Sequence, residues 1–222
     1  MAIALHELCR RYRALYMPAV SDALYGLGLP EQVLPSGLRP LFPEERMVGE
    51  AFTVLGQPLD TIGWDAGVER IQSYLQVFER LTPDTVLVSV NPNSHVGHFG
   101  ELTGNSAKQH GCVGVVLEGN LRDTEGLREI KLQVFYRDLS PLNAIGRWEM
   151  AAAQQPVKIG SVTVHPGDIV MGEFDGILVI PRMDAERVLL ESEKIAAAES
   201  NVRSEMKTGI SPLRSFETHG HI

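Results

Sequence analysis

The chain has few cysteines, no long apolar run and no excess of positive charge. Its two cysteines, Cys9 and Cys112, cannot build a disulfide framework, so we expect both to pack as small apolar residues in a reducing compartment. No apolar stretch approaches the roughly 20 residues that a membrane helix needs. The N-terminal segment also lacks the charged start and long apolar run of a signal peptide. These absences predict a soluble, cytoplasmic protein with no membrane partner.

The chain also lacks an excess of positive charge and several common catalytic motifs. The formal net charge is −8, whereas nucleic-acid binding needs a concentrated basic face, so we expect no nucleic-acid partner. No HExxH, Walker A or GxSxG pattern occurs, and Gly26-Leu27-Gly28 lacks the third glycine of a dinucleotide site. His95, His98 and His110 have no further ligand at zinc-site spacing. We expect loop or surface positions for them, with His98 as one that could border a pocket.

Helical and strand-like segments alternate along the chain. Six helices are predicted, over 4–16, from Pro18 to Gly26 or Gly28, and over 66–81, 100–110, 124–130 and about 184–207. Eight strands are predicted, over 48–55, 85–90, 113–117, 133–136, 157–159, 162–164, 169–171 and 177–180. Residues 30–45, rich in proline, predict an irregular loop. The pattern indicates one mixed α/β domain over 1–222, with a parallel portion, a later antiparallel section and a long C-terminal helix.

The segment from Gly100 to Asp123 carries the chemistry. Gly100-Glu101 opens a predicted helix, and Arg122-Asp123 follows the next predicted strand. A loop, helix, strand and loop in this order can return both ends to the same side of a sheet. Free amides at a helix start and an arginine suit a carboxylate, and an aspartate among waters suits Mg²⁺. This combination favours a small 2-oxo acid as ligand.

Each of these residues also has a structural alternative. Asp123 could cap the helix that follows it, and Gly100-Glu101 could be an ordinary helix start. Asp168 and Asp175 lie in turn sequences and are interpreted as structural. A Schiff-base mechanism would need a lysine in an apolar pocket, and Lys158, the one candidate, is predicted to be a strand residue with its amine in solvent.

The spacing of Gly100-Glu101 and Arg122-Asp123 resembles the signature of a known family. That family joins 4-hydroxy-4-methyl-2-oxoglutarate aldolases to the RraA-type regulators of RNase E. Three further blocks are similar: 20–24 (VSDAL), 164–170 (VHPGDIV) and 175–181 (DGILVIP). The resemblance covers about residues 18–210. It implies a layered fold of the swivelling β/β/α type, assembled as homotrimers or homohexamers.

The resemblance also implies roles for individual residues. Asp123 would hold Mg²⁺, Mn²⁺ or another divalent metal, and Arg122 would bind the oxo-acid carbonyl and carboxylate. Gly100 would allow close backbone approach, so that the amides of Leu102 and Thr103 grip the substrate carboxylate. The family often has an acidic residue three positions after the aspartate of this motif. This chain has Gly126 at that position instead, with Glu125 one place earlier.

The sequence therefore predicts a metal-dependent lyase that releases pyruvate from 4-hydroxy-2-oxo acids of the 4-hydroxy-4-methyl-2-oxoglutarate type. Oxaloacetate decarboxylation is expected as a related activity, because it passes through the same enolate. Glu101 is one candidate catalytic carboxylate. Glu199, on the last helix, is the other, reaching in from a neighbouring subunit. The alternative is a regulator of the RraA type that binds an RNase without turnover. Fold alone does not decide between them.

Overall fold

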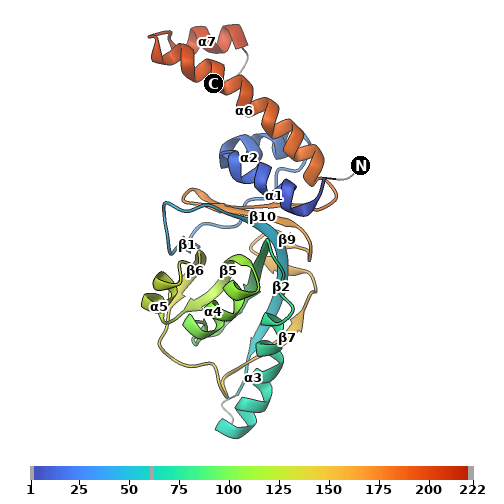
Figure 1. Cartoon of the computed structure of the whole chain (residues 1–222), viewed down its shortest axis with the longest axis vertical. Helices are drawn as coiled ribbons and strands as arrows, with labels where there is room; N and C mark the ends of the chain where they lie inside the picture. Colours follow the sequence, from blue (N-terminus) through green and yellow to red (C-terminus); the bar gives the residue numbers. More distant parts are fainter. Residues whose placement is uncertain (1–2, 61–62, 220–222) are drawn as a thin grey trace.

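The computed structural model describes residues 3–60 and 63–219, and its centre is a curled nine-stranded sheet (Figure 1). The strands of this sheet are β1 (Arg39–Pro40), β2 (Met47–Pro58), β3 (Thr85–Val90), β4 (Gly97–Phe99), β5 (Cys112–Leu121), β6 (Val134–Leu139), β7 (Trp148–Ala153), β10 (Ile169–Glu173) and β11 (Gly176–Ile180). A separate antiparallel hairpin is formed by β8 (Val157–Ile159) and β9 (Val162–Val164). The helices are α1 (Leu5–Ala14), α2 (Met17–Gly26), α3 (Trp64–Phe78), α4 (Glu101–Gln109), α5 (Thr124–Glu129), α6 (Ala185–Lys207) and α7 (Pro212–His219).

Five strands, β2, β3, β4, β5 and β6, form the parallel portion of the sheet, in which the short β4 pairs with β5. β2 pairs with β3, β3 with β5, and β5 with β6, all in parallel, while β7, β10 and β11 add antiparallel pairs. Every residue of β3 is buried, which is expected of a parallel strand whose two faces are both covered. The predicted mixed α/β fold, with a parallel portion, an antiparallel section and a long C-terminal helix, is therefore confirmed.

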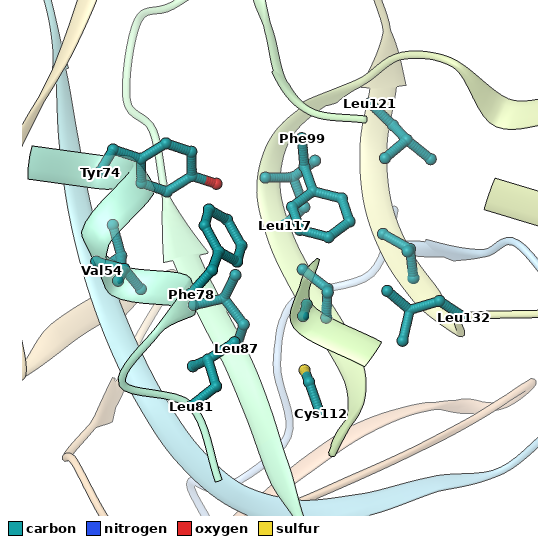
Figure 2. Close-up of a cluster of buried hydrophobic side chains, with 14 of the residues drawn as sticks. Val54, Tyr74, Phe78, Leu81, Leu87, Phe99, Cys112, Leu117, Leu121 and Leu132 are labelled. Carbon is teal, nitrogen blue, oxygen red and sulfur yellow. The ribbon is translucent and has the colours of Figure 1, made fainter. Parts of the chain in front are cut away.

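Three apolar clusters hold the layers together. One lies between the sheet and helices α3, α4 and α5, and Figure 2 shows the α3 rings of Tyr74 and Phe78 beside Phe99 and Leu117 in it. A second joins α1, α2 and α6 to β10 and β11. The third packs the β8–β9 hairpin against the strands of the sheet. Figure 1 shows α1, α2 and the start of α6 as a layer apart from α4 and α5, with α6 running outward to α7.

Some elements differ from the sequence prediction. β2 continues three residues beyond Leu55, past a register shift at Gly56, because β7 pairs with this extension. β5 continues to Leu121, which brings Arg122 directly to a strand end. The sequence did not predict β1, β4, β7 or α7. β1 and β4 are only two and three residues long, and β7 is alanine-rich. Gly209, with φ +93°, follows the end of α6 as expected of a glycine after a helix.

Both cysteines are buried, as predicted: Cys9 in the cluster of α1, α2 and α6, and Cys112 in the cluster under α3 and α4. No helix among the described residues is long and apolar enough to cross a membrane.

The cluster under α3 and α4 should dominate stability. Leu117 is fully buried there, so Leu117→Ala should lower the free energy of unfolding by about 2–5 kcal/mol through lost burial and the cavity left behind. Urea denaturation measures this, with Leu213→Ala as the control because Leu213 on α7 is 68% exposed. Equal losses for the two variants would contradict the assignment of the core.

Candidate functional site

Arg122 and Asp123 lie at the carboxyl end of β5 and face each other. The Arg122 Nε donates a hydrogen bond to Asp123 Oδ2 at 3.1 Å, and the Arg122 backbone N–H donates to the carbonyl of Phe99 at 3.0 Å. Asp123 has a left-handed backbone, φ 53° and ψ 42°, a conformation that aspartate tolerates better than most residues. Asp123 is the N-cap residue of α5, as the structural alternative predicted, but its side chain makes no capping bond to the helix.

The start of α4 lies against this pair. Its N-cap is Gly100, which has no side chain to cap the helix, and the first helical hydrogen bond runs from the Gly104 amide to the Gly100 carbonyl at 2.9 Å. Thr103 Oγ1 instead accepts a bond from the Gly100 amide at 3.1 Å. The amides of Glu101, Leu102 and Thr103 are thus left without a side-chain cap at the positive end of the helix dipole. This is a favourable setting for an anionic group.

Two glycines make the contact between α4 and the Arg122-Asp123 pair possible. A Cβ added at Gly100 would lie 2.4 Å from Asp123 Oδ2, and one added at Gly97 would lie 2.9 Å from Arg122 Cβ and Cδ. The predicted role of Gly100 in close approach of a substrate stays a prediction, and what the structure shows is the room that this glycine leaves for Asp123. The role of Gly97 was missed, because nothing in the local sequence indicates which segment a glycine will meet.

A pocket of about 290 Å³ opens over the pair, near the lower limit of small-ligand sites. Its lining comprises Trp64, Ile71, Tyr74, Leu75, Gly97, His98, Phe99, Gly100, Leu102, Thr103, Arg122, Asp123, Asn143, Ala144 and Ile145. The predicted residues Gly100, Leu102, Thr103, Arg122 and Asp123 are therefore brought together. The α3 wall and the residues from Asn143 to Ile145 were not predicted, since they join the pocket only through tertiary packing.

His98 borders the pocket, but it is not a surface residue. It is 4% exposed; its Nε2 lies 2.8 Å from Ser94 Oγ, and its Nδ1 accepts a bond from the Asn120 amide at 3.3 Å. Burial lowers the pKa of the imidazole to about 4, so the ring is neutral at pH 7. His98 therefore adds no positive charge to the pocket. His95 and His110 are exposed, as expected.

Glu101 packs against Gly126, the position where the family that this chain resembles often has an acidic residue. A Cβ added at Gly126 would lie 2.4 Å from Glu101 Cγ, so the absence of a side chain at 126 leaves room for Glu101. The Glu101 carboxylate accepts a bond from Asn105, one turn along α4, and does not line the pocket. Glu125 is exposed on α5. Glu101 is thus the carboxylate that occupies the space beside Gly126.

Glu199 is not brought to the pair within one chain. It lies on α6 and is bonded to the Tyr16 hydroxyl, with Arg203 at 3.5 Å. Figure 1 places α6 at the far end of the molecule from α4 and α5. Burial, and secondarily the bond to Glu199, raises the pKa of Tyr16 to about 12, so this hydroxyl stays protonated as a donor. A role for Glu199 at the site of a neighbouring subunit stays a prediction.

Lys158 and Asp168, two other positions considered in the sequence, lie outside the lining of this pocket. Among residues 3–60 and 63–219, no group of three or more His, Cys, Asp or Glu is placed to hold a metal ion. Lys158 is exposed on β8, as predicted. Asp168 is buried and accepts bonds from the amides of His165 and Arg182, which confirms its structural role in the turn.

These features define a mixed α/β protein with a candidate anion site outside the carboxyl ends of parallel strands, where ligands of open α/β sheets commonly bind. The chain belongs to the RraA-like family, whose model, described as Aldolase/RraA, matches residues 17–179.

Proteins similar to this chain carry several kinds of name. A protein of Halalkalibacterium halodurans named "Putative 4-hydroxy-4-methyl-2-oxoglutarate aldolase" is 24% identical over 210 residues, covering 95% of this chain and 93% of that protein. Protein DlpA of Legionella pneumophila is 25% identical over 190 residues, which are 86% of this chain but 30% of DlpA. The crystal structure of Streptomyces coelicolor RraAS2, described as an unusual member of the RNase ES inhibitor RraA family, superposes with a TM-score of 0.79. It is 24% identical and covers 90% of this chain and 98% of its own, which supports the fold.

The glycine contact gives a direct test of the site geometry. Gly100→Ala should displace the Asp123 carboxylate and weaken Mn²⁺ binding at least about tenfold, while the fold is retained. Calorimetric titration measures the affinity, and circular dichroism checks the fold. Gly26→Ala is the matched control, because a Cβ at this helical glycine meets no atom within 4 Å. Unchanged Mn²⁺ affinity in Gly100→Ala would contradict the geometry.

Proposed function

We propose that the protein is a divalent-metal-dependent lyase that cleaves 4-hydroxy-2-oxo acids to pyruvate. The observation that carries this proposal is the Arg122-Asp123 pair held against the uncapped start of α4 inside one pocket. The names of relatives such as the Halalkalibacterium protein support the same class of reaction. Substrates of the 4-hydroxy-4-methyl-2-oxoglutarate type are the starting point, and oxaloacetate decarboxylation is a related activity.

The residues present fit a hydrated divalent cation at Asp123. Its carboxylate is 43% exposed, and within the described chain its one side-chain hydrogen bond comes from Arg122. Gly100 leaves open the space beside Oδ2 that a side chain would fill. A site with one carboxylate suits Mg²⁺ or Mn²⁺, which keep several waters. Such a cation would supply Lewis-acid polarisation of the C2 oxo group. Glu101, beside Gly126, is the candidate carboxylate for its water shell.

The chain itself would orient the substrate. The amides of Leu102 and Thr103 are positioned to bind the C1 carboxylate, since they lie at the positive end of α4 within the pocket lining. The Arg122 guanidinium uses Nε on Asp123, so its terminal nitrogens are available to donate to the C2 oxygen. Arg122 would then stabilise the negative charge that develops there.

The bond changes follow from this orientation. As the C4 hydroxyl loses its proton, the C3–C4 bond breaks, and its electron pair moves to form the enolate of pyruvate at C2 and C3. C4 leaves as an aldehyde or ketone, and protonation of C3 gives pyruvate. In oxaloacetate the C3–C4 bond breaks in the same sense and C4 leaves as carbon dioxide. In both reactions the charge forms on the oxygen that Arg122 faces.

We also propose that the protein is cytoplasmic and that it assembles into an oligomer. The resemblance to the family implies homotrimers or homohexamers, in which Glu199 would serve the site of a neighbouring subunit. Val188 and Leu189, apolar residues near the start of α6, are buried within the chain against α1 and α2. In Figure 1 the outer part of α6 projects beyond the layer of α1 and α2.

The second candidate is a regulator that binds an RNase without turnover. It is favoured by the fold likeness to RraAS2, whose description places it in an RNase inhibitor family. Turnover separates the two. Metal-dependent pyruvate release from a panel of 4-hydroxy-2-oxo acids supports the lyase, whereas tight binding to an RNase scaffold without pyruvate release supports the regulator.

Asp123→Asn should abolish metal-dependent pyruvate release while the fold remains intact. The amide keeps the shape but loses the charge that attracts a divalent cation. Coupled assay of pyruvate and calorimetric titration with Mg²⁺ or Mn²⁺ measure the two losses. Asp175→Asn, at the exposed β10–β11 turn, is the control and should behave as wild type. Full activity with unchanged metal affinity in Asp123→Asn would remove Asp123 from the site.

Arg122→Lys should lower turnover by about 10²–10³, because lysine keeps the charge but cannot bond Asp123 and the C2 oxygen with one planar group. The control is Arg10→Lys, since Arg10 also makes a two-pronged contact, with Glu7, but on the exposed face of α1. Near-normal turnover in Arg122→Lys would reduce Arg122 to a general electrostatic role.

A further inference from the structure

We propose that His98 is a positioning residue, whose imidazole holds the end of β5 in the geometry that the Arg122-Asp123 pair needs. His98 acts through the backbone of β5 and not on the reacting atoms. Its effect on turnover rests on the proposed function, whereas the positioning itself is measured without turnover.

The pairing of β4 with β5 contains a one-residue irregularity at His98. Gly97 lies opposite Asn120, and Phe99 lies opposite Leu121, so two steps along β4 match one step along β5. His98 is the extra residue. Such bulges bend a strand and redirect its side chains, and they are frequent next to active sites. This one immediately precedes the start of α4.

The His98 side chain ties the irregular pairing together. The Asn120 backbone N–H donates to His98 Nδ1 at 3.3 Å. A backbone N–H cannot accept, so Nδ1 is the unprotonated nitrogen and Nε2 carries the proton of the neutral ring. Nε2 then donates to Ser94 Oγ at 2.8 Å, and the Asn120 side chain closes the triangle by donating to the Ser94 carbonyl at 3.4 Å. Burial lowers the pKa of the imidazole to about 4, which keeps this neutral form at pH 7.

The same contact controls the strand end that carries the site. Asn120 lies two residues before Arg122 on β5, and the Arg122 backbone N–H donates to the carbonyl of Phe99, the residue after His98, at 3.0 Å. Two alternate N–H groups of β5 are therefore held by adjacent residues of β4, one by a side chain and one by a carbonyl. If His98 released Asn120, the bond to Phe99 alone would hold this end of β5 on β4.

The imidazole is also fixed by its shape. A Cβ added at Gly119 would lie 2.9 Å from His98 Nδ1, so this glycine leaves room for the ring. The Trp148 ring packs edge-on against it, with centroids 5.7 Å apart and planes at 67°. The Tyr74 hydroxyl donates to the His98 backbone carbonyl at 3.3 Å. A test must therefore separate the hydrogen-bond acceptor at Nδ1 from the volume of the ring.

Two substitutions make this separation. In His98→Asn the side-chain oxygen takes the place of Nδ1 and can accept from Asn120, although the side chain is smaller. His98→Leu keeps apolar volume against Trp148 but has no acceptor. Amide hydrogen exchange, followed by NMR, measures the result without metal or substrate. We expect the Asn120 and Arg122 amides to exchange at least about tenfold faster in His98→Leu than in the wild type, and within about threefold of it in His98→Asn.

The Val88 amide, in the centre of the buried strand β3, is the internal control because it reports on unfolding of the whole domain. Equal acceleration of Val88 and Arg122 in His98→Leu would overturn the inference, since His98 would then stabilise only the fold. Better protection in His98→Leu than in His98→Asn would also overturn it, since volume would then decide. His95→Leu, at an exposed histidine of the preceding loop, is the matched control and should exchange as wild type.

Metal affinity and turnover carry the test to the site. His98→Leu should lower Mn²⁺ affinity and pyruvate release at least about tenfold each, and His98→Asn should keep both within about threefold of the wild type. Faster exchange at Arg122 with unchanged Mn²⁺ affinity would overturn the inference, because Asp123 would then not depend on this contact. A wild type that binds no Mn²⁺ or releases no pyruvate contradicts the proposed function instead, while the exchange rates still decide the role of His98.

Discussion

The site depends on one close contact between two strand ends. The backbone N–H of Arg122, just after β5, bonds to the carbonyl of Phe99, at the end of β4. This bond sets Arg122 and Asp123 against the start of α4, and Gly97 and Gly100 allow it because any side chain there would collide with the pair. The same contact thus positions a guanidinium, a carboxylate and a set of helix amides within one pocket. Each group alone is a common surface feature; their convergence makes a candidate anion and metal site.

The rest of the fold holds those strand ends in place. β5 lies between β3 and β6 in the parallel portion of the sheet, so its end cannot shift without disturbing both neighbours. Phe99, next to Gly100, is buried against Phe78 of α3, with ring centroids 6.2 Å apart. Figure 2 shows this ring beside Leu117 of β5, so the apolar core lies directly beneath the site. Core packing and site geometry are therefore coupled in this protein.

The sequence predicted the parts of the structure that local chemistry determines. Apolar runs such as 85–90 and 113–117 predicted buried strands, and the order of Gly100-Glu101 and Arg122-Asp123 predicted that they meet at one side of the sheet. Contacts between distant segments were not predictable from local patterns. Examples are the room that Gly126 leaves for Glu101, and the bond between Tyr16 and Glu199, which joins opposite ends of the chain. The α3 wall of the pocket is of the same kind, because periodicity predicted the helix but not what its apolar face would border.

The central claim is that this pocket stabilises the enolate of a 2-oxo acid when a divalent cation is present. Exchange of the methyl protons of pyruvate for deuterium in D₂O, followed by proton NMR, measures this directly and needs no assumption about the far end of the substrate. The account predicts exchange that requires both the wild-type protein and Mg²⁺ or Mn²⁺, and that stops when a chelator is added. A folded, metal-supplied protein that leaves the methyl signal of pyruvate unchanged would contradict it.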